Sequence, residues 1–198
     1  MDNLTLKQFI KKAHENAVKH GFYDDFTIER PDMPKLLMLI VCEVAELMEA
    51  DRKGIWLINR DLFVVDELTQ MVEGGDVATA DFVEYYKQHV KGCAEEELAD
   101  ICIRCFDALG FIGADEVSIN HYYLIEERAA DYSVASLCYA MCKELTSGIT
   151  LQEDSHALTA VIKAIVLWCE SHSIDLMLHI KAKMLYNESR PYKHGKRY

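Results

Sequence analysis

Apolar residues recur at helical spacing along most of the chain. The first stripe predicts a helix over 6–19, with Thr5 and Gln8 forming a capping box at its beginning. After a loop, a second helix is predicted to begin near Pro34 and to end before Gly54.

The later helical stretches are separated by short, mostly glycine-containing turns. Asp76 and Ser155 are the expected N-caps of two of them, and Gly110 is the expected end of a third. The alternation typical of strands is missing apart from a β-prone stretch at 63–65, so the pattern predicts an all-α fold. The predicted ranges are 61–73, 77–90, 93–109, 115–128, 132–146, 156–171 and 174–188.

The second helix carries two acidic residues in an otherwise apolar run, LLMLIVCEVAELMEA. Glu43 and Glu46 are three residues apart, which places them about 60° apart on one helix face. Two like charges in this position repel by a few tenths of a kcal/mol unless a cation lies between them. Because the surrounding residues predict a mostly buried helix, these carboxylates need partners.

A second pair, Glu97 and Asp100, has the same spacing in AEEELADICIRCFDAL. Four carboxylates from two packed helices would form an oxygen-rich site for a hard divalent cation. Neither helix has a histidine three residues after its first glutamate, whereas the helices of di-iron proteins have the pattern Glu-x-x-His. Mg²⁺ or Mn²⁺ is therefore favoured. The alternative is that these are ordinary solvated acidic residues on amphipathic helices.

The length of 198 residues predicts a single domain with a substantial core. The start of the chain lacks the features of a signal peptide, and the longest apolar run, 36–42, is too short to span a membrane. We therefore expect a cytoplasmic protein without membrane segments. The seven cysteines are best explained as reduced, mostly buried thiols, and Cys102-x-x-Cys105 as core packing rather than half of a zinc or redox site.

The net charge of −12 argues against binding to a nucleic-acid polymer. The charge is unevenly distributed, because residues 181–198 carry +5 and the other 180 residues carry −17. A basic segment on an acidic body suggests a small anionic ligand bound at one place.

Three stretches together resemble the MazG-type all-α nucleoside triphosphate pyrophosphohydrolases. These stretches are EVAELMEA, EEELADICIRCFDAL and KMLYNESRPYKHGKRY. The family has an ExxE helix, an ExxD helix and a basic segment ending in Arg-Pro-Tyr-x-His-Gly-Lys, all present here in that order. The resemblance covers less than half of the chain. It implies a MazG-like helical bundle over 1–198, with inserted segments at about 55–91 and 114–173.

The resemblance implies hydrolysis of a nucleoside triphosphate to the monophosphate and pyrophosphate. It assigns Mg²⁺ binding and catalysis to the four carboxylates, and it implies a homodimer or a higher homo-oligomer. Alternatives are a hydrolase acting on another diphosphate-containing nucleotide, a non-catalytic helical module that binds nucleotide or metal, and an interaction protein. The metal-binding residues would be Glu43, Glu46, Glu97 and Asp100.

Several cations of the basic segment are candidates for contact with phosphate. Lys183 and Asn187 lie one helical turn apart on one face, so both could reach the same phosphate group. Arg190, Lys193 and Lys196 would neutralise the departing pyrophosphate.

The remaining candidates have weaker support from the sequence. Trp56 could stack on a base or simply pack in the core, and His194 could touch phosphate. Arg104 and Asp107 continue the face of the second acidic pair, either supporting the site or pairing with each other. The neighbouring acidic residues expected to be solvated are Glu49, Glu95 and Glu96.

Overall fold

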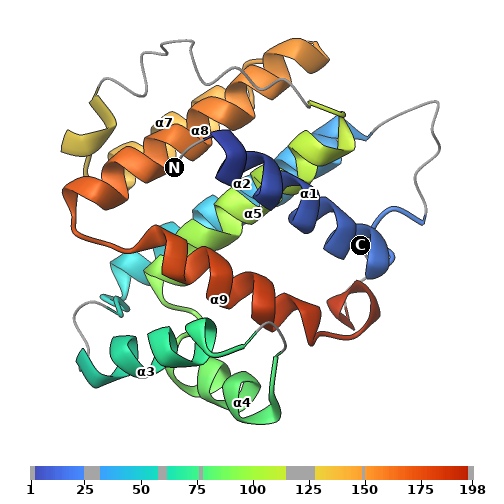
Figure 1. Ribbon diagram of the computed structural model, residues 1–198. Helices are drawn as coiled ribbons and strands as arrows, with labels where there is room; N and C mark the ends of the chain where they lie inside the picture. The colour runs from blue at the N-terminus through green and yellow to red at the C-terminus, as the bar shows by residue number, and fades with distance from the viewer. Residues whose placement is uncertain are drawn as a thin grey trace.

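The computed structural model describes residues 3–24, 32–57, 62–75, 78–114, 128–148 and 150–195. Within these ranges the chain forms helices and no strand, which confirms the predicted all-α fold (Figure 1). The β-prone stretch at 63–65 is helical, and positions 115–127 of one predicted helix lie outside the described residues. The elements are α1 (Asn3–Lys19), α2 (Met33–Arg52), α3 (Leu62–Glu73), α4 (Ala80–His89), α5 (Ala94–Phe111), the 3₁₀ turn η1 (Ala129–Asp131), α7 (Val134–Leu145), α8 (Leu151–Ser171), α9 (Leu176–Glu188) and the 3₁₀ turn η2 (Tyr192–Gly195).

Helix α5 is the centre of the fold. It packs against α1, α2, α8 and α9, and Figure 1 shows it crossing the middle of the molecule. Because α5 has neighbours on several sides, its residues are apolar around most of its circumference. Cys102 and Cys105 are fully buried free thiols whose pKa values are raised by that burial, so the core-packing interpretation is confirmed.

The two segments predicted as inserts extend the apolar core in different directions. Helices α7 and α8 bury Leu137 and Ile165 in the main core with α2 and α5. Helices α3 and α4 bury Leu68 and Phe82 in a second core that packs on α9 (Figure 1). The segment containing α7 and α8 therefore packs on α2 and α5, and the segment containing α3 and α4 packs on α9.

Two predicted helix starts are wrong by several residues. Helix α4 begins after Thr79, whose side chain accepts a hydrogen bond from Phe82 N at 3.2 Å. Helix α8 begins after Thr150, which forms a reciprocal capping box with Glu153, and this places Ser155 inside the helix. In both regions another capping residue was available close to the true start, and the tertiary packing selects it.

The packing of α1 against α5 also moves two predicted boundaries. Thr5 lies inside α1, which is already helical at Asn3. Gly110 lies inside α5 and does not end it. A Cβ atom at Gly110 would lie 2.6 Å from His14 Cβ, so this glycine allows the two helices to approach closely.

The segment that follows α9 is held against the end of α1. Lys193 N donates to His20 O at 2.8 Å, and His20 Nε2 lies 3.0 Å from Arg190 O. Tyr192 donates a hydrogen bond to Asp24 at 2.5 Å. These contacts join parts of the chain that are about 170 positions apart in the sequence.

Gly21 is the point where α1 and η2 come closest. It adopts a φ of +77°, and a Cβ atom there would collide with the ring of Tyr192. We expect Gly21→Ala to lower the free energy of unfolding by about 1–2 kcal/mol for the left-handed backbone, plus about 1–3 kcal/mol for the collision. Gly54→Ala is the matched control, because Gly54 has a φ of +69° and nothing within 4 Å of the added atom. Equal losses of stability in urea unfolding would show that the collision has no effect.

None of the helices in the described ranges is long and apolar enough to cross a membrane.

Candidate functional site

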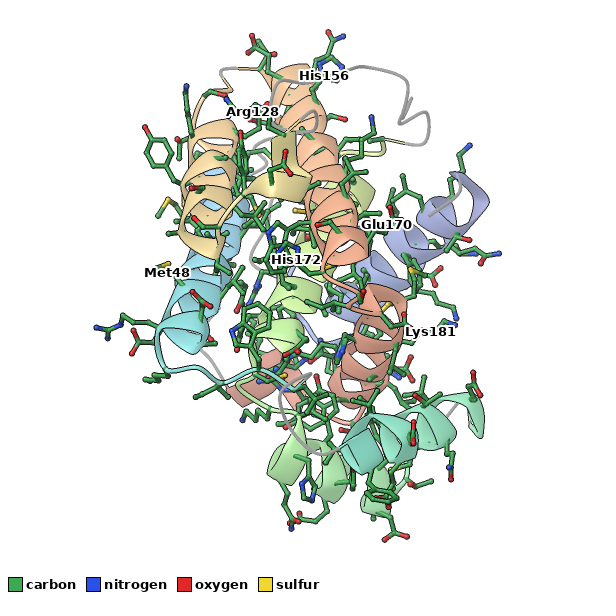
Figure 2. The ribbon with its side chains drawn as sticks, turned by 90° about the vertical axis from the view of Figure 1, so that its left-hand side faces the viewer. Met48, Arg128, His156, Glu170, His172 and Lys181 are labelled. Atoms are coloured by element: carbon green, nitrogen blue, oxygen red, sulfur yellow. The ribbon has the colours of Figure 1, made fainter. Side chains whose placement is uncertain are left out.

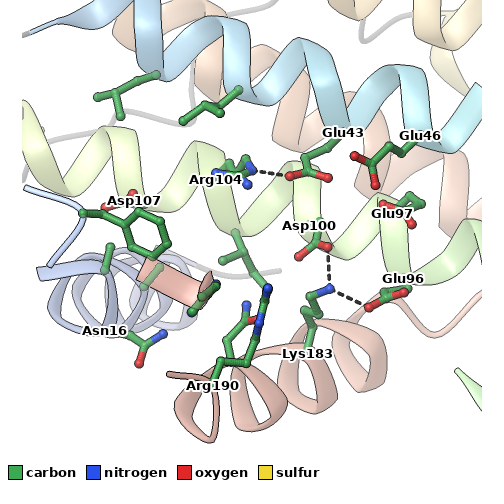
Figure 3. Close-up of a pocket in the computed structure, with 18 of the residues that line it drawn as sticks. Asn16, Glu43, Glu46, Glu96, Glu97, Asp100, Arg104, Asp107, Lys183 and Arg190 are labelled. Carbon is green, nitrogen blue, oxygen red and sulfur yellow. Dashed lines mark hydrogen bonds and ion pairs between the residues drawn. The ribbon is translucent and has the colours of Figure 1, made fainter. Parts of the chain in front are cut away.

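A cavity of about 290 Å³ lies between α1, α2, α5, α9 and η2. Acidic residues reach it from α2 and α5, and cations from α5, α9 and the segment after α9 (Figure 3). The turn after α1 contributes aromatic side chains. The lining residues used below are Asn16, Phe22, Tyr23, Glu43, Glu46, Glu96, Glu97, Asp100, Arg104, Asp107, Lys183, Asn187, Arg190 and His194.

Three of the four predicted metal ligands come together in this cavity. Glu43, Glu97 and Asp100 each offer a carboxylate oxygen, and these oxygens all lie within 4.8 Å of one another. The spacing of three residues on α5 turns Glu97 and Asp100 toward Glu43 on α2. Glu46 lines the same cavity, but its side chain is exposed and it is not part of this group.

Glu97 has the properties of a carboxylate that lacks a counter-ion. Its Oε2 atom is buried and has no hydrogen-bond partner among the residues that the structure describes. Burial, together with the negative charges of Asp100 and Glu96, raises the pKa of Glu97 to about 8. A bound cation would satisfy this oxygen, and the all-oxygen donor set fits a hard divalent ion.

Glu43 is already paired across the helix interface. Arg104 Nε lies 2.5 Å from Glu43 Oε1. Burial raises the pKa of Glu43, and the guanidinium of Arg104 opposes that shift. Arg104 therefore supports a proposed ligand and does not form the intrahelical pair with Asp107. Asp107 instead accepts hydrogen bonds from Tyr23 at 2.8 Å and from His14 at 2.9 Å.

Lys183 forms the most buried ion pairs of the cavity. Its Nζ atom lies 2.6 Å from Asp100 Oδ2 and 2.5 Å from Glu96 Oε1 (Figure 3). Burial by itself would lower the pKa of Lys183, but the two carboxylates raise it above its usual value, so the ammonium stays charged. Asn187, one turn further along α9, also lines the cavity, as their spacing predicted.

Glu95 and Glu96 are not solvated neighbours, as the sequence suggested. They are 1% and 2% exposed. Glu95 accepts a hydrogen bond from Leu57 N at 2.8 Å, and Glu96 accepts from Tyr86 and from Gly92 N. The second core covers the beginning of α5, and carboxylates are favourable there because the first turn of a helix exposes unpaired N–H groups. Glu49 remains a surface residue that pairs with its helical neighbours.

The cations after α9 are divided between the cavity and the surface. Arg190 lines the cavity, and its Nη1 atom lies 3.4 Å from Asn187 Oδ1. Lys193 is outside the cavity lining, with its ammonium 5.7 Å from the centre of the Tyr192 ring. Lys196 lies outside the described residues. Of the residues predicted to contact phosphate, Lys183, Asn187 and Arg190 line the cavity, and the contacts themselves stay a prediction.

His194 also lines the cavity, but it adds no positive charge there. Burial, assisted by the positive charge of Arg190, lowers the pKa of His194 to about 3. Its imidazole is neutral at ordinary pH, so it cannot attract a phosphate as a cation.

Trp56 packs in the core and is not part of the cavity lining. Its indole donates to Asp51 at 3.0 Å, and its ring centre lies 5.9 Å from that of Trp168. The packing alternative of the sequence analysis therefore describes it better than base stacking.

The cavity also contains residues that the sequence pattern did not single out. Asn16 lies on α1, and Phe22 and Tyr23 lie in the turn that follows. The sequence carried no signal for them, because an asparagine and two aromatic residues near a helix end are common in any helical protein.

Comparisons with protein-family models, with curated proteins and with solved structures found no match to this chain.

The raised pKa of Glu97 predicts how stability depends on pH in the metal-free protein. The unfolded chain loses this proton near the ordinary value of 4.5, whereas the folded protein keeps it up to about 8. The contribution of Glu97 to stability is thus full below pH 4.5 and is lost as pH rises through 8. We expect urea unfolding in EDTA to show stability falling over this range, with a shallower fall for Glu97→Gln. Identical slopes in the two proteins would contradict the raised pKa.

Proposed function

We propose that this chain is a divalent-cation-dependent hydrolase that splits nucleoside triphosphates into the monophosphate and pyrophosphate, as its resemblance to the MazG-type enzymes implies. One observation carries the proposal. Three carboxylates lie within 4.8 Å of one another, one with an unpartnered buried oxygen, in a cavity that also contains buried cations. Acidic clusters facing cations suit a metal-bound polyphosphate.

In this proposal, Glu43, Glu97 and Asp100 hold Mg²⁺ or Mn²⁺, and Glu46 is available at the rim of the cavity. The bound ion would neutralise phosphate charge and lower the pKa of a coordinated water. Glu46 lies outside the close group, so it is the carboxylate we assign to accept a proton from the attacking water.

The cations supply the other half of the proposed chemistry. Lys183 is held rigidly by two carboxylates, and Arg190 lies on the same side of the cavity (Figure 3). Because their charges are fixed before the substrate arrives, they can stabilise negative charge on phosphate oxygens without reorganising. Arg190 also provides local positive charge on a protein whose net charge of −12 repels anions.

We also propose that the chain associates with itself. Met38 on α2 is 53% exposed and Tyr139 on α7 is 73% exposed, and these two helices pack side by side. These side chains are available for contact with a second copy of the chain, which the resemblance to the MazG-type family implies. Light scattering should give at least twice the monomer mass, and a monomer at every concentration with full activity would contradict this proposal.

The function is tested by a panel of ribo- and deoxyribonucleoside triphosphates incubated with the protein and Mg²⁺, with products separated by chromatography. We expect a nucleoside monophosphate and pyrophosphate, and no reaction in EDTA. Release of a nucleoside diphosphate and phosphate would overturn the proposal. Binding without turnover would favour a binding module, and turnover of only other diphosphate-containing nucleotides would favour the related hydrolase.

A further inference from the structure

The cavity contains most of the unpartnered buried polar atoms of the described chain. Four buried side-chain nitrogen or oxygen atoms have no hydrogen-bond partner among the described residues. Three of them, Glu97 Oε2, Asn16 Oδ1 and His194 Nε2, belong to residues that line this cavity. Buried polar atoms are almost always paired in folded proteins, so three such atoms around one cavity offer hydrogen bonds to a polar ligand.

Asn16 lies away from the acidic group of Glu43, Glu97 and Asp100, because Figure 3 shows Asn16 and Glu97 on opposite sides of the cavity. Tyr23, which also lines the cavity, is hydrogen-bonded to Asp107. Asp107 is ten residues beyond Glu97 on α5, or about 15 Å at the rise of an α-helix. We call the part of the cavity lined by Asn16, Phe22, Tyr23 and His194 the Asn16 end. A ligand that pairs with both Glu97 and Asn16 therefore contacts the acidic group with one part and the Asn16 end with another.

The Asn16 end has aromatic walls. Tyr23 is held by Asp107 and stacks on Phe111 with ring centres 5.0 Å apart. The ring of His194 meets Phe22 edge-on, with ring centres 5.0 Å apart. His194 also adopts a φ of +49°, a backbone conformation that is costly for a residue with a side chain. A strained residue with an unpaired side-chain nitrogen is typical of a binding site.

Three side chains at this end of the cavity, those of Asn16, Tyr23 and His194, carry no charge, although Arg104, Asp107 and Arg190 also line the cavity. The low pKa of His194 keeps its imidazole uncharged, and burial raises the pKa of Tyr23, so its hydroxyl keeps its proton. Asn16 carries no charge. A phosphate has no counter-charge among these three side chains, whereas a flat, neutral group with polar edges fits between aromatic walls.

We propose that Asn16 and His194, together with the aromatic side chains of Phe22 and Tyr23 that line the same cavity, form the subsite for the base of the nucleotide. Asn16 Oδ1 accepts a hydrogen bond from an N–H group of the base, and His194 Nε2 makes a second hydrogen bond to the base edge. The phosphates then point toward Glu97 and the cations. This inference rests on the proposed function in taking the ligand to be a nucleotide. It predicts that bases with an N–H donor at that edge are preferred.

The subsite is tested by binding measurements without turnover. The whole protein is titrated by calorimetry in EDTA with nucleoside 5′-monophosphates of four different bases, and with ribose 5-phosphate, which has no base. We expect at least one monophosphate to bind about tenfold or more tightly than ribose 5-phosphate. Wild-type protein that binds every monophosphate no better than ribose 5-phosphate would overturn the proposal.

Variants then assign the preference to residues. Asn16→Ala and His194→Ala should each reduce the affinity for the preferred monophosphate about tenfold, toward that of ribose 5-phosphate. Asn16→Asp keeps an oxygen acceptor, so this variant should retain the preference for a base that donates an N–H group. A purely structural role of Asn16 would not explain such retention. Lys12→Ala, at an exposed position of α1, is the control and should bind like the wild type. Full retention of the base preference in Asn16→Ala would overturn the assignment.

The two proposals fail in different ways. A base preference that depends on Asn16, together with no hydrolysis of any triphosphate, would leave the subsite standing and overturn the enzyme. Hydrolysis of triphosphates at the same rate whatever the base, with no base preference in binding, would leave the enzyme standing and overturn the subsite.

Discussion

Replacing Lys183 by methionine is expected to lower the free energy of unfolding by about 3–5 kcal/mol, because it removes one partner of a buried ion pair and leaves the other uncompensated. Lys183 contacts the carboxylates of Asp100 and Glu96 together, so the substitution leaves two acidic groups without their shared cation. Methionine fills nearly the same volume, so the loss reflects charge more than packing. For a domain of this size the melting temperature should fall by about 6–20 °C.

Lys181→Met is the matched control for this prediction. Lys181 lies on the same helix but is exposed, and Figure 2 shows it on the surface of α9. Its replacement should change stability by no more than about 0.5 kcal/mol. Urea unfolding of both variants measures the difference. A similar loss of stability in the two variants would show that the Lys183 ion pairs contribute nothing.

Replacing Glu97 by glutamine is expected to reduce cation-dependent turnover about 100-fold or more, the range seen when a charge-stabilising group is removed from an active site. Glutamine keeps the shape of the side chain but removes the negative charge that the bound cation requires. The same change should stabilise the metal-free protein at pH 8, because it removes an unpaired buried charge. Loss of activity combined with a gain in stability is the expected signature of this residue.

Initial rates measured over a range of Mg²⁺ concentrations test the effect on activity, and melting temperatures with and without Mg²⁺ test the effect on binding. Mg²⁺ should raise the melting temperature of the wild type and should have little effect on Glu97→Gln. Glu49→Gln is the control, because Glu49 lies on the surface of α2 and pairs only with Arg52 and Lys53 in the contacts described. Wild-type rates for Glu97→Gln at limiting Mg²⁺ would contradict the proposed site.

The sequence predicted the acidic part of the cavity because that part depends on local spacing. Positions three residues apart share a helix face, so Glu97 and Asp100 had to point the same way once α5 formed. Whether Glu43 or Glu46 faces α5 depends on how α2 is rotated against it, and spacing within one helix carries no information about that rotation. The structure turns Glu43 inward and leaves Glu46 at the rim.

The Asn16 end of the cavity could not be predicted, because it depends on contacts between distant parts of the chain. Asn16 and His194 line the same cavity only because the turn after α9 is held against the end of α1. The burial of Glu95 and Glu96 has a similar origin, since it depends on the second core covering the start of α5. Periodicity describes each helix by itself and does not report which ends come together.

The long sequence separation between the two walls of the cavity has a kinetic consequence. The contact between His20 and Arg190 closes a loop of about 170 residues, whereas several contacts of the main core lie much closer in sequence. Contacts at such separation tend to form late in folding, so a chain can have a complete core while its cavity is still open. The same short segment, 190–195, buries little and is among the first that could detach on warming. Ligand binding should then be lost at a lower temperature than helix content, and the interval between the two would measure how firmly this last segment is attached.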